Sequence, residues 1–154
     1  MKRLIAVLGT CVVLFMTSGA TADDISVAEN WIAAWNSHDV DRVLGVFTSD
    51  VLYEDVPLGV VNRGADELRA FAAGAFAAVP DIRFDLVNAS LKGGHGTIEL
   101  VFSGTDVGLY GTGRRFSVRG ATVIDVHGQI IARNSDYYDL ATIQRQLGLL
   151  PPGL

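Results

Sequence analysis

The chain has 154 residues, of which 49% are hydrophobic, and its 17 acidic and 12 basic side chains give a formal net charge of −5 at pH 7. An acidic surface repels phosphate backbones, so nucleic acid is not expected as a partner. The only cysteine, Cys11, lies near the N-terminus, which excludes an internal disulfide.

The first 22 residues have the pattern of a secretory signal peptide. Lys2 and Arg3 form a charged start, residues 4–16 are almost wholly apolar, and small residues occupy positions 20–22. The apolar run is shorter than the ~20 residues that span a bilayer. We therefore expect a secreted or periplasmic protein that has no membrane association after cleavage.

Cleavage after Ala22 leaves residues 23–154 as a single domain with ten basic and 17 acidic residues, a formal charge of −7. Modification of Cys11 as a lipoprotein anchor is the alternative to cleavage, although Thr10 is a poor residue before a lipidated cysteine.

Hydrophobic periodicity predicts helices first and strands afterwards. Apolar residues at three- and four-residue steps predict an amphipathic helix, and Asp39 can cap a second, short helix that runs through Phe47. Pro57, Gly59 and Gly64 indicate a loop. The expected elements are helices over 24–37 and 39–47, a strand over 51–55, a helix over 66–79, strands over 82–91, 96–106, 114–126 and 129–139, and a closing helix that ends at 146–148. This order favours an α+β domain in which a curved antiparallel sheet wraps around the early helices.

Two of these strands carry carboxylates. Period-two alternation puts Asn134, Asp136 and Tyr138 on one face of the last strand, and Tyr53 and Asp55 on one face of the first. If both faces turn inward, the two carboxylates share one pocket.

A carboxylate in an apolar pocket has a raised pKa, which suits a general acid or base at neutral pH. Asp136 is the first candidate for this role, with Asp55 and Asp106 as partners and Tyr53 orienting substrate or water. The simpler alternative is that these aspartates cap helices or pair with arginines. We expect the pocket itself to be lined by Trp31, Trp35, Phe76, Phe102 and Tyr138, whose bulk suits a flat apolar ligand.

Other patterns carry less chemistry. His38, His95 and His127 are scattered without ligand spacing, so neither a metal site nor a cofactor is expected. The glycine-rich stretch over 108–113 is not followed by a helix, which favours a loop at the pocket mouth over a phosphate site.

Motifs in a fixed order resemble the nuclear transport factor 2-like superfamily, in particular its SnoaL-like polyketide cyclase branch. They are the stretches at 35–41 (WNSHDVD), 53–59, 76–81, 127–130 (HGQI) and 138–148. The resemblance implies a cone of helices and curved sheet around an apolar pocket, and commonly a homodimer through the outer sheet.

Three enzyme types of this superfamily resemble parts of the chain. In the cyclase type, Asp106 stands where a histidine is typical, before a Thr-Gly-Arg turn at 112–114. The ketosteroid isomerase type implies Asp55 as general base, with Trp31 near the place of an oxyanion-stabilising tyrosine. The limonene-type epoxide hydrolase implies that Tyr53, Asp55 and Asp136 hold a water.

Taken together, we expect a cofactor-free cyclase or isomerase that acts on a small apolar molecule through a pocket aspartate. Epoxide hydrolysis and a carrier domain without catalysis are the alternatives.

Overall fold

The computed structural model describes residues 22–151. The predictions of a signal peptide and of a role for Cys11 concern residues 1–22, of which only Ala22 lies within the described part. The elements are α1 (Ala22–Asn36), α2 (Val40–Leu44), β1 (Phe47–Asp55), β2 (Val60–Arg63), α3 (Gly64–Ala78), β3 (Arg83–Lys92), β4 (His95–Thr105), β5 (Arg115–His127), β6 (Ile130–Tyr138) and α4 (Leu140–Gln146).

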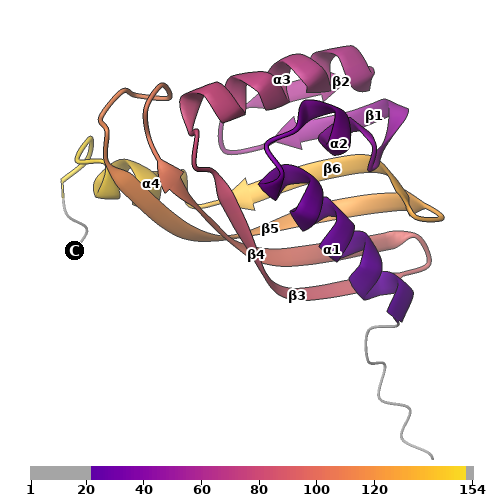
Figure 1. Ribbon diagram of the computed structural model, residues 1–154. Helices are drawn as coiled ribbons and strands as arrows, with labels where there is room; N and C mark the ends of the chain where they lie inside the picture. Colours follow the sequence, from indigo (N-terminus) through magenta and orange to yellow (C-terminus); the bar gives the residue numbers. More distant parts are fainter. Residues whose placement is uncertain (1–21, 152–154) are drawn as a thin grey trace, which may run out of the picture.

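The strands form one sheet in the order β2-β1-β6-β5-β4-β3. All neighbours are antiparallel except β1 and β6, which run parallel. Figure 1 shows α1, α2 and α3 on one side of this curved sheet. The α+β architecture expected from the order of helices and strands is confirmed.

The core lies between these helices and the concave face of the sheet. Trp31 and Trp35 of α1 are each 1% exposed, and Leu68 and Ala72 of α3 are fully buried. The four-residue spacing within each pair puts its two members on one helix face, where burial of a large apolar side chain contributes about 1.5–3 kcal/mol. These helices therefore form a wall opposite the sheet.

The turns of the strand meander follow from glycine. Gly93 and Gly94 join β3 to β4 with φ of 61° and 82°, the left-handed region that a tight hairpin turn requires. The meander β3-β4-β5-β6 thus agrees with the sequence analysis. Among the described residues, no helix is long and apolar enough to span a bilayer.

Two local predictions are wrong. Asp39 does cap a helix, accepting hydrogen bonds from the Asp41 and Arg42 amides, but the helix ends at Leu44 and Phe47 begins β1. The stretch after Pro57, predicted as loop, contains the short strand β2. The turn at 56–59 ends at Gly59, with φ of 67°, and lets β2 pair back onto β1.

Candidate functional site

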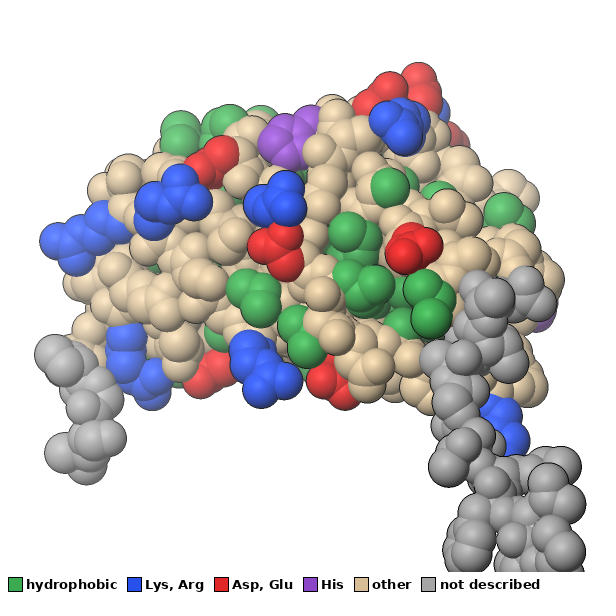
Figure 2. All heavy atoms as spheres, turned by 60° about the horizontal axis from the view of Figure 1, so that its bottom comes forward, with side chains coloured by type: hydrophobic (Ala, Val, Ile, Leu, Met, Phe, Trp, Pro, Cys, Tyr) green, Lys and Arg blue, Asp and Glu red, His purple; other side chains and the backbone are tan. Residues whose placement is uncertain are grey.

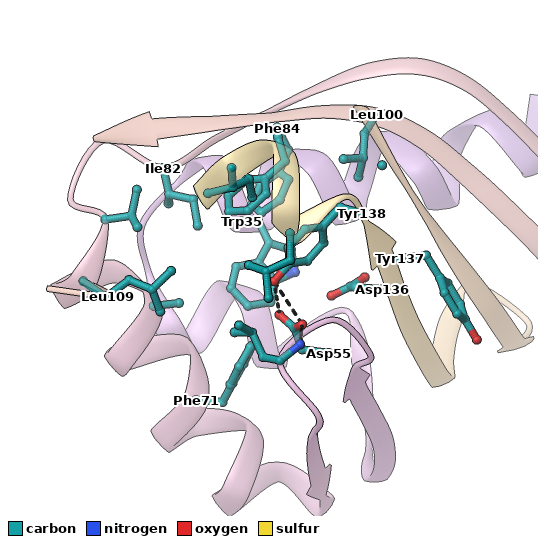
Figure 3. A pocket seen from close by; sticks show the side chains of 18 of the residues that line it. Trp35, Asp55, Phe71, Ile82, Phe84, Leu100, Leu109, Asp136, Tyr137 and Tyr138 are labelled. Carbon is teal, nitrogen blue, oxygen red and sulfur yellow. Dashed lines mark hydrogen bonds between the residues drawn. The ribbon is translucent and has the colours of Figure 1, made fainter. Parts of the chain in front are cut away.

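A cavity of about 300 Å³ lies between the helices and the sheet. Its wall is mainly aromatic and aliphatic, and polar groups reach it mostly from β1 and β6 (Figure 3). The principal lining residues are Trp31, Trp35, Tyr53, Asp55, Phe71, Phe84, Leu100, Phe102, Leu109, Phe116, Asp136 and Tyr138. No lysine or arginine is among the described residues that line it.

The parallel pairing of β1 with β6 brings the polar groups together. Tyr53 lies opposite Asn134, and Asp55 lies opposite Asp136. Residues directly opposite each other project on the same face of a sheet, here the concave one. Both carboxylates therefore face the same cavity, as the alternation of the two strands predicts.

Asp136 has a hydrogen-bond donor on each of its oxygens. Its Oδ2 accepts a hydrogen bond from the Tyr53 hydroxyl, and its Oδ1 accepts one from Asn134 Nδ2 at 2.8 Å. Burial raises the pKa of Asp136, and hydrogen bonds from Tyr53, Thr122 and Asn134 offset part of this increase. Both of its oxygens are thus engaged by protein donors.

Asp55 also accepts hydrogen bonds on both of its oxygens. The Tyr138 hydroxyl lies 3.0 Å from both of its oxygens, and the Leu58 amide donates to Oδ1 at 3.0 Å. Burial, with a further contribution from the charge of Asp136, raises the pKa of Asp55 to about 6, although the Leu58 and Tyr138 hydrogen bonds oppose the rise. Oδ2 accepts from Tyr138 alone, which leaves it capacity for another partner.

The two tyrosines are donors that stay protonated. Burial, reinforced by the nearby aspartates, raises the pKa of both Tyr53 and Tyr138 above the usual value near 10. Each tyrosine therefore serves one aspartate: Tyr53 donates to Asp136, and Tyr138 donates to Asp55.

The two tryptophans differ in their polar contacts. Trp31 Nε1 donates to Asn134 Oδ1 at 3.0 Å, which extends the chain of hydrogen bonds from α1 through Asn134 to Asp136. Trp35 Nε1 is buried and has no hydrogen-bond partner among the described residues. Trp31 thus holds Asn134, which in turn donates to Asp136, whereas the Nε1–H of Trp35 is unpaired among the described residues.

Asp106 does not belong to this cavity, contrary to the sequence prediction. It is fully buried in the β4–β5 connection and accepts hydrogen bonds from the backbone amides of Tyr110, Gly111 and Thr112 and from the Thr112 hydroxyl. Burial acts to raise the pKa of Asp106, but these hydrogen bonds together lower it to about 2. Its contacts make it the organiser of a loop that extends Leu109 to the cavity wall.

Phe76 is the second residue outside the cavity wall. It stacks on His38 with ring centroids 5.3 Å apart and touches the edge of Trp35 at 5.7 Å. Phe71 and Phe84 line the wall instead. Alternation in the strand predicted over 82–91 placed Phe84 on a definite face, but the sequence did not show which face turns inward.

The described residues contain no group of three or more His, Cys, Asp or Glu side chains arranged to hold a metal ion. The cavity holds two carboxyl groups with raised pKa, each of which accepts a hydrogen bond from a tyrosine, and one unpaired indole donor inside an aromatic enclosure. Such a set can bind a small apolar molecule and exchange a proton with it.

Comparison with known proteins gives the family. The family model described as SnoaL-like polyketide cyclase matches residues 25–147, so the chain belongs to the SnoaL-like polyketide cyclase family. Its fold is that of nuclear transport factor 2-like and ketosteroid isomerase-like proteins. No curated protein matches it significantly.

Solved structures show the same fold over most of the chain. A protein with a ketosteroid isomerase-like fold from Catenulispora acidiphila, in complex with trimethylamine, is 27% identical, covering 80% of this chain and 93% of that chain with a TM-score of 0.74. TsrD from Streptomyces laurentii is 27% identical over 84% and 97% of the two chains, with a TM-score of 0.73. A candidate polyketide cyclase from Pseudomonas putida is 22% identical over 78% and 94%, with a TM-score of 0.69.

Proposed function

We propose that this protein is a cofactor-free enzyme that moves a proton on a small apolar molecule, in an isomerisation or a cyclisation, with Asp55 as the acid/base group. The observation that carries this proposal is the Asp55 carboxyl group, only 6% exposed, on the wall of an aromatic cavity with a pKa of about 6. A general base works best when its pKa lies near the operating pH.

The proton transfer needs no group beyond those in the cavity. The ionised Asp55 takes a proton from a carbon next to an electron-withdrawing group, and the electron pair of the broken C–H bond moves into that group. Asp55, now protonated, returns the proton at another position of the substrate. Tyr138 holds the carboxyl group throughout, because its hydroxyl spans both oxygens of Asp55.

The sequence favours Asp136 as the acid/base group, whereas we assign this role to Asp55, whose pKa of about 6 lies near neutral pH. Asp136 supports it, because its charge raises the pKa of Asp55. The epoxide hydrolase alternative has less support, because Tyr53, which would hold the attacking water, donates directly to Asp136.

Deuterium exchange on a simple ketone tests the proposal. 2-Tetralone, a flat bicyclic ketone, exchanges the protons next to its carbonyl in D2O when a base removes them, and NMR follows the rate. We expect the wild-type protein to accelerate this exchange and Asp55→Asn to abolish the acceleration. Equal rates for the wild type and Asp55→Asn would remove Asp55 from the reaction.

A carrier without catalysis is the second candidate. Aromatic rings and carboxylates without a basic neighbour also suit a protonated amine, which aromatic faces attract. The similar Catenulispora protein in complex with trimethylamine supports this reading. Tight binding of trimethylamine by a protein that does not exchange 2-tetralone protons would favour the carrier.

Two further properties belong to the same proposal. The charged start and apolar run before Asp23 support export to a secreted or periplasmic location. Figure 2 shows apolar side chains among charged ones on one face of the molecule, and such a face supports a homodimer. Tyr137, which follows the cavity-lining Asp136 on β6, is 45% exposed. Sedimentation of wild type and Tyr137→Glu tests the dimer, since the charged variant should be monomeric.

A further inference from the structure

The indole of Trp35 lies in the wall of the cavity with an unused donor. The side chain is 1% exposed, and its Nε1 has no hydrogen-bond partner among the described residues. A buried N–H without an acceptor costs free energy, so such groups are uncommon unless something absent from the structure pairs with them.

The neighbours of Trp35 are aromatic and offer it no oxygen. Its ring centroid lies 5.8 Å from Tyr53, 5.9 Å from Phe84 and 6.5 Å from Phe71. The nearby carboxylates take their hydrogen bonds from other donors: Tyr53 and Asn134 for Asp136, and Leu58 and Tyr138 for Asp55. No acceptor for Trp35 Nε1 is thus present among the described residues, and a ligand in the cavity is the candidate to supply one.

Trp31 provides an internal comparison. It lies one helical turn earlier on α1, is equally buried, and donates its Nε1–H to Asn134. The fold thus pairs one indole with a protein acceptor and leaves the other unpaired in the cavity that also holds Asp55. Figure 3 shows Trp35, Tyr138 and Asp55 grouped in the same part of this cavity.

We propose that Trp35 Nε1–H receives the carbonyl oxygen of the ligand and thereby selects flat apolar ketones or aldehydes. This inference rests on the proposed function, because Trp35 lines the same cavity as Asp55, the proposed acid/base group. As Asp55 removes the proton, negative charge moves onto the carbonyl oxygen, where the indole donor stabilises it. An amine offers no acceptor once protonated and leaves the Trp35 donor unpaired.

Matched ligands separate the hydrogen bond from simple packing. 2-Tetralone and tetralin share one bicyclic skeleton and differ in the carbonyl oxygen. The chain contains two tryptophans, so a ¹⁵N–¹H spectrum has two indole signals, and Trp35→Phe assigns them. We expect saturating 2-tetralone to move the Trp35 indole proton downfield much more than tetralin does, with a smaller change at Trp31.

The affinity of Trp35→Phe gives a second readout. Loss of one hydrogen bond should weaken 2-tetralone by roughly 3- to 10-fold more than it weakens tetralin. The ratio of the two effects corrects for the smaller ring, and thermal unfolding verifies that the variant is folded.

The outcomes distinguish this inference from the proposed function. If tetralin and 2-tetralone shift the Trp35 signal equally and lose equal affinity in Trp35→Phe, while Asp55-dependent exchange persists, the donor role is wrong and the proposed function stands. If neither compound binds, the proposed function fails and the inference fails with it.

Discussion

Two buried aspartates in this protein have pKa values that are shifted in opposite directions. Asp55 in the cavity wall has a pKa raised to about 6, and Asp106 in the β4–β5 connection has a pKa lowered to about 2. Both are almost inaccessible, at 6% and 0% exposure. Burial alone therefore does not decide whether a carboxyl group is suited to proton transfer.

The difference lies in the donors around each carboxylate. Asp106 accepts from three backbone amides and the Thr112 hydroxyl, which stabilise its charged form. Asp55 accepts from one amide and one phenol and lies near the negative Asp136. The carboxylate with four hydrogen-bond donors stays ionised and organises a loop. The carboxylate with fewer donors and a negative neighbour takes up a proton more readily.

The largest expected effect is on activity. Asp55→Asn should lower the catalysed deuterium exchange of 2-tetralone by about 10²- to 10⁴-fold, the usual contribution of a general base. Asp136→Asn should lower it less, because Asp136 acts on Asp55 through its charge. A greater loss in Asp136→Asn than in Asp55→Asn would reverse the assignment of the two roles.

The pH dependence of stability is the next test. The folded state holds the Asp55 proton up to a pKa of about 6, whereas the unfolded chain releases it near 3.8. The free energy of unfolding therefore falls as pH rises between these values, by up to about 3 kcal/mol. Urea unfolding at pH 4 and pH 7.5 should show Asp55→Asn gaining stability relative to wild type at the higher pH. An equal difference between the two proteins at both pH values would contradict the raised pKa.

These contrasts also mark what the sequence could and could not predict. Alternation predicts that Tyr53 and Asp55 share one face of β1 and that Asn134 and Asp136 share one face of β6. The pairing of β1 with β6 makes these two faces part of the same side of the sheet. The parallel direction of that pairing has no local signal, because it joins residues more than 80 positions apart. Asp106 was misassigned because its partners are amides four to six residues ahead, and alternation says nothing about them.

Short elements were the least predictable part of the fold. Strand β2 has only four residues and is ordered by its pairing with β1, so it is too short to show an alternating pattern in the sequence. The long elements α1, α3 and β3 to β6 have enough repeats for the apolar pattern to be read.

Substitution of Asp106 should lower the stability of the protein at neutral pH, whereas substitution of Asp55 should raise it. Asp106→Asn replaces one acceptor oxygen by an NH2 group that faces amide donors, which should destabilise the protein by about 2 kcal/mol at pH 7. Because the folded-state pKa is depressed, the contribution of the Asp106 charge is present above the unfolded value near 3.8 and is lost as pH falls toward 2. Urea unfolding at pH 7 and pH 3 measures both effects. Unaltered stability at pH 7 would show that the loop does not depend on this carboxylate.

The smallest expected effect concerns the phenols, and it separates the two carboxylates of the cavity. Tyr138→Phe removes a hydrogen bond that lowers the pKa of Asp55, so the pH at which the exchange of 2-tetralone reaches half its maximum should move above about 6. Tyr53→Phe is the matched control: it removes a donor from Asp136, raises the pKa of Asp136 and reduces its negative charge beside Asp55. The midpoint in Tyr53→Phe should therefore stay or move down. Shifts of the same sign in both variants would mean that the two carboxyl groups titrate as one unit, and the division of roles between Asp55 and Asp136 would then be wrong.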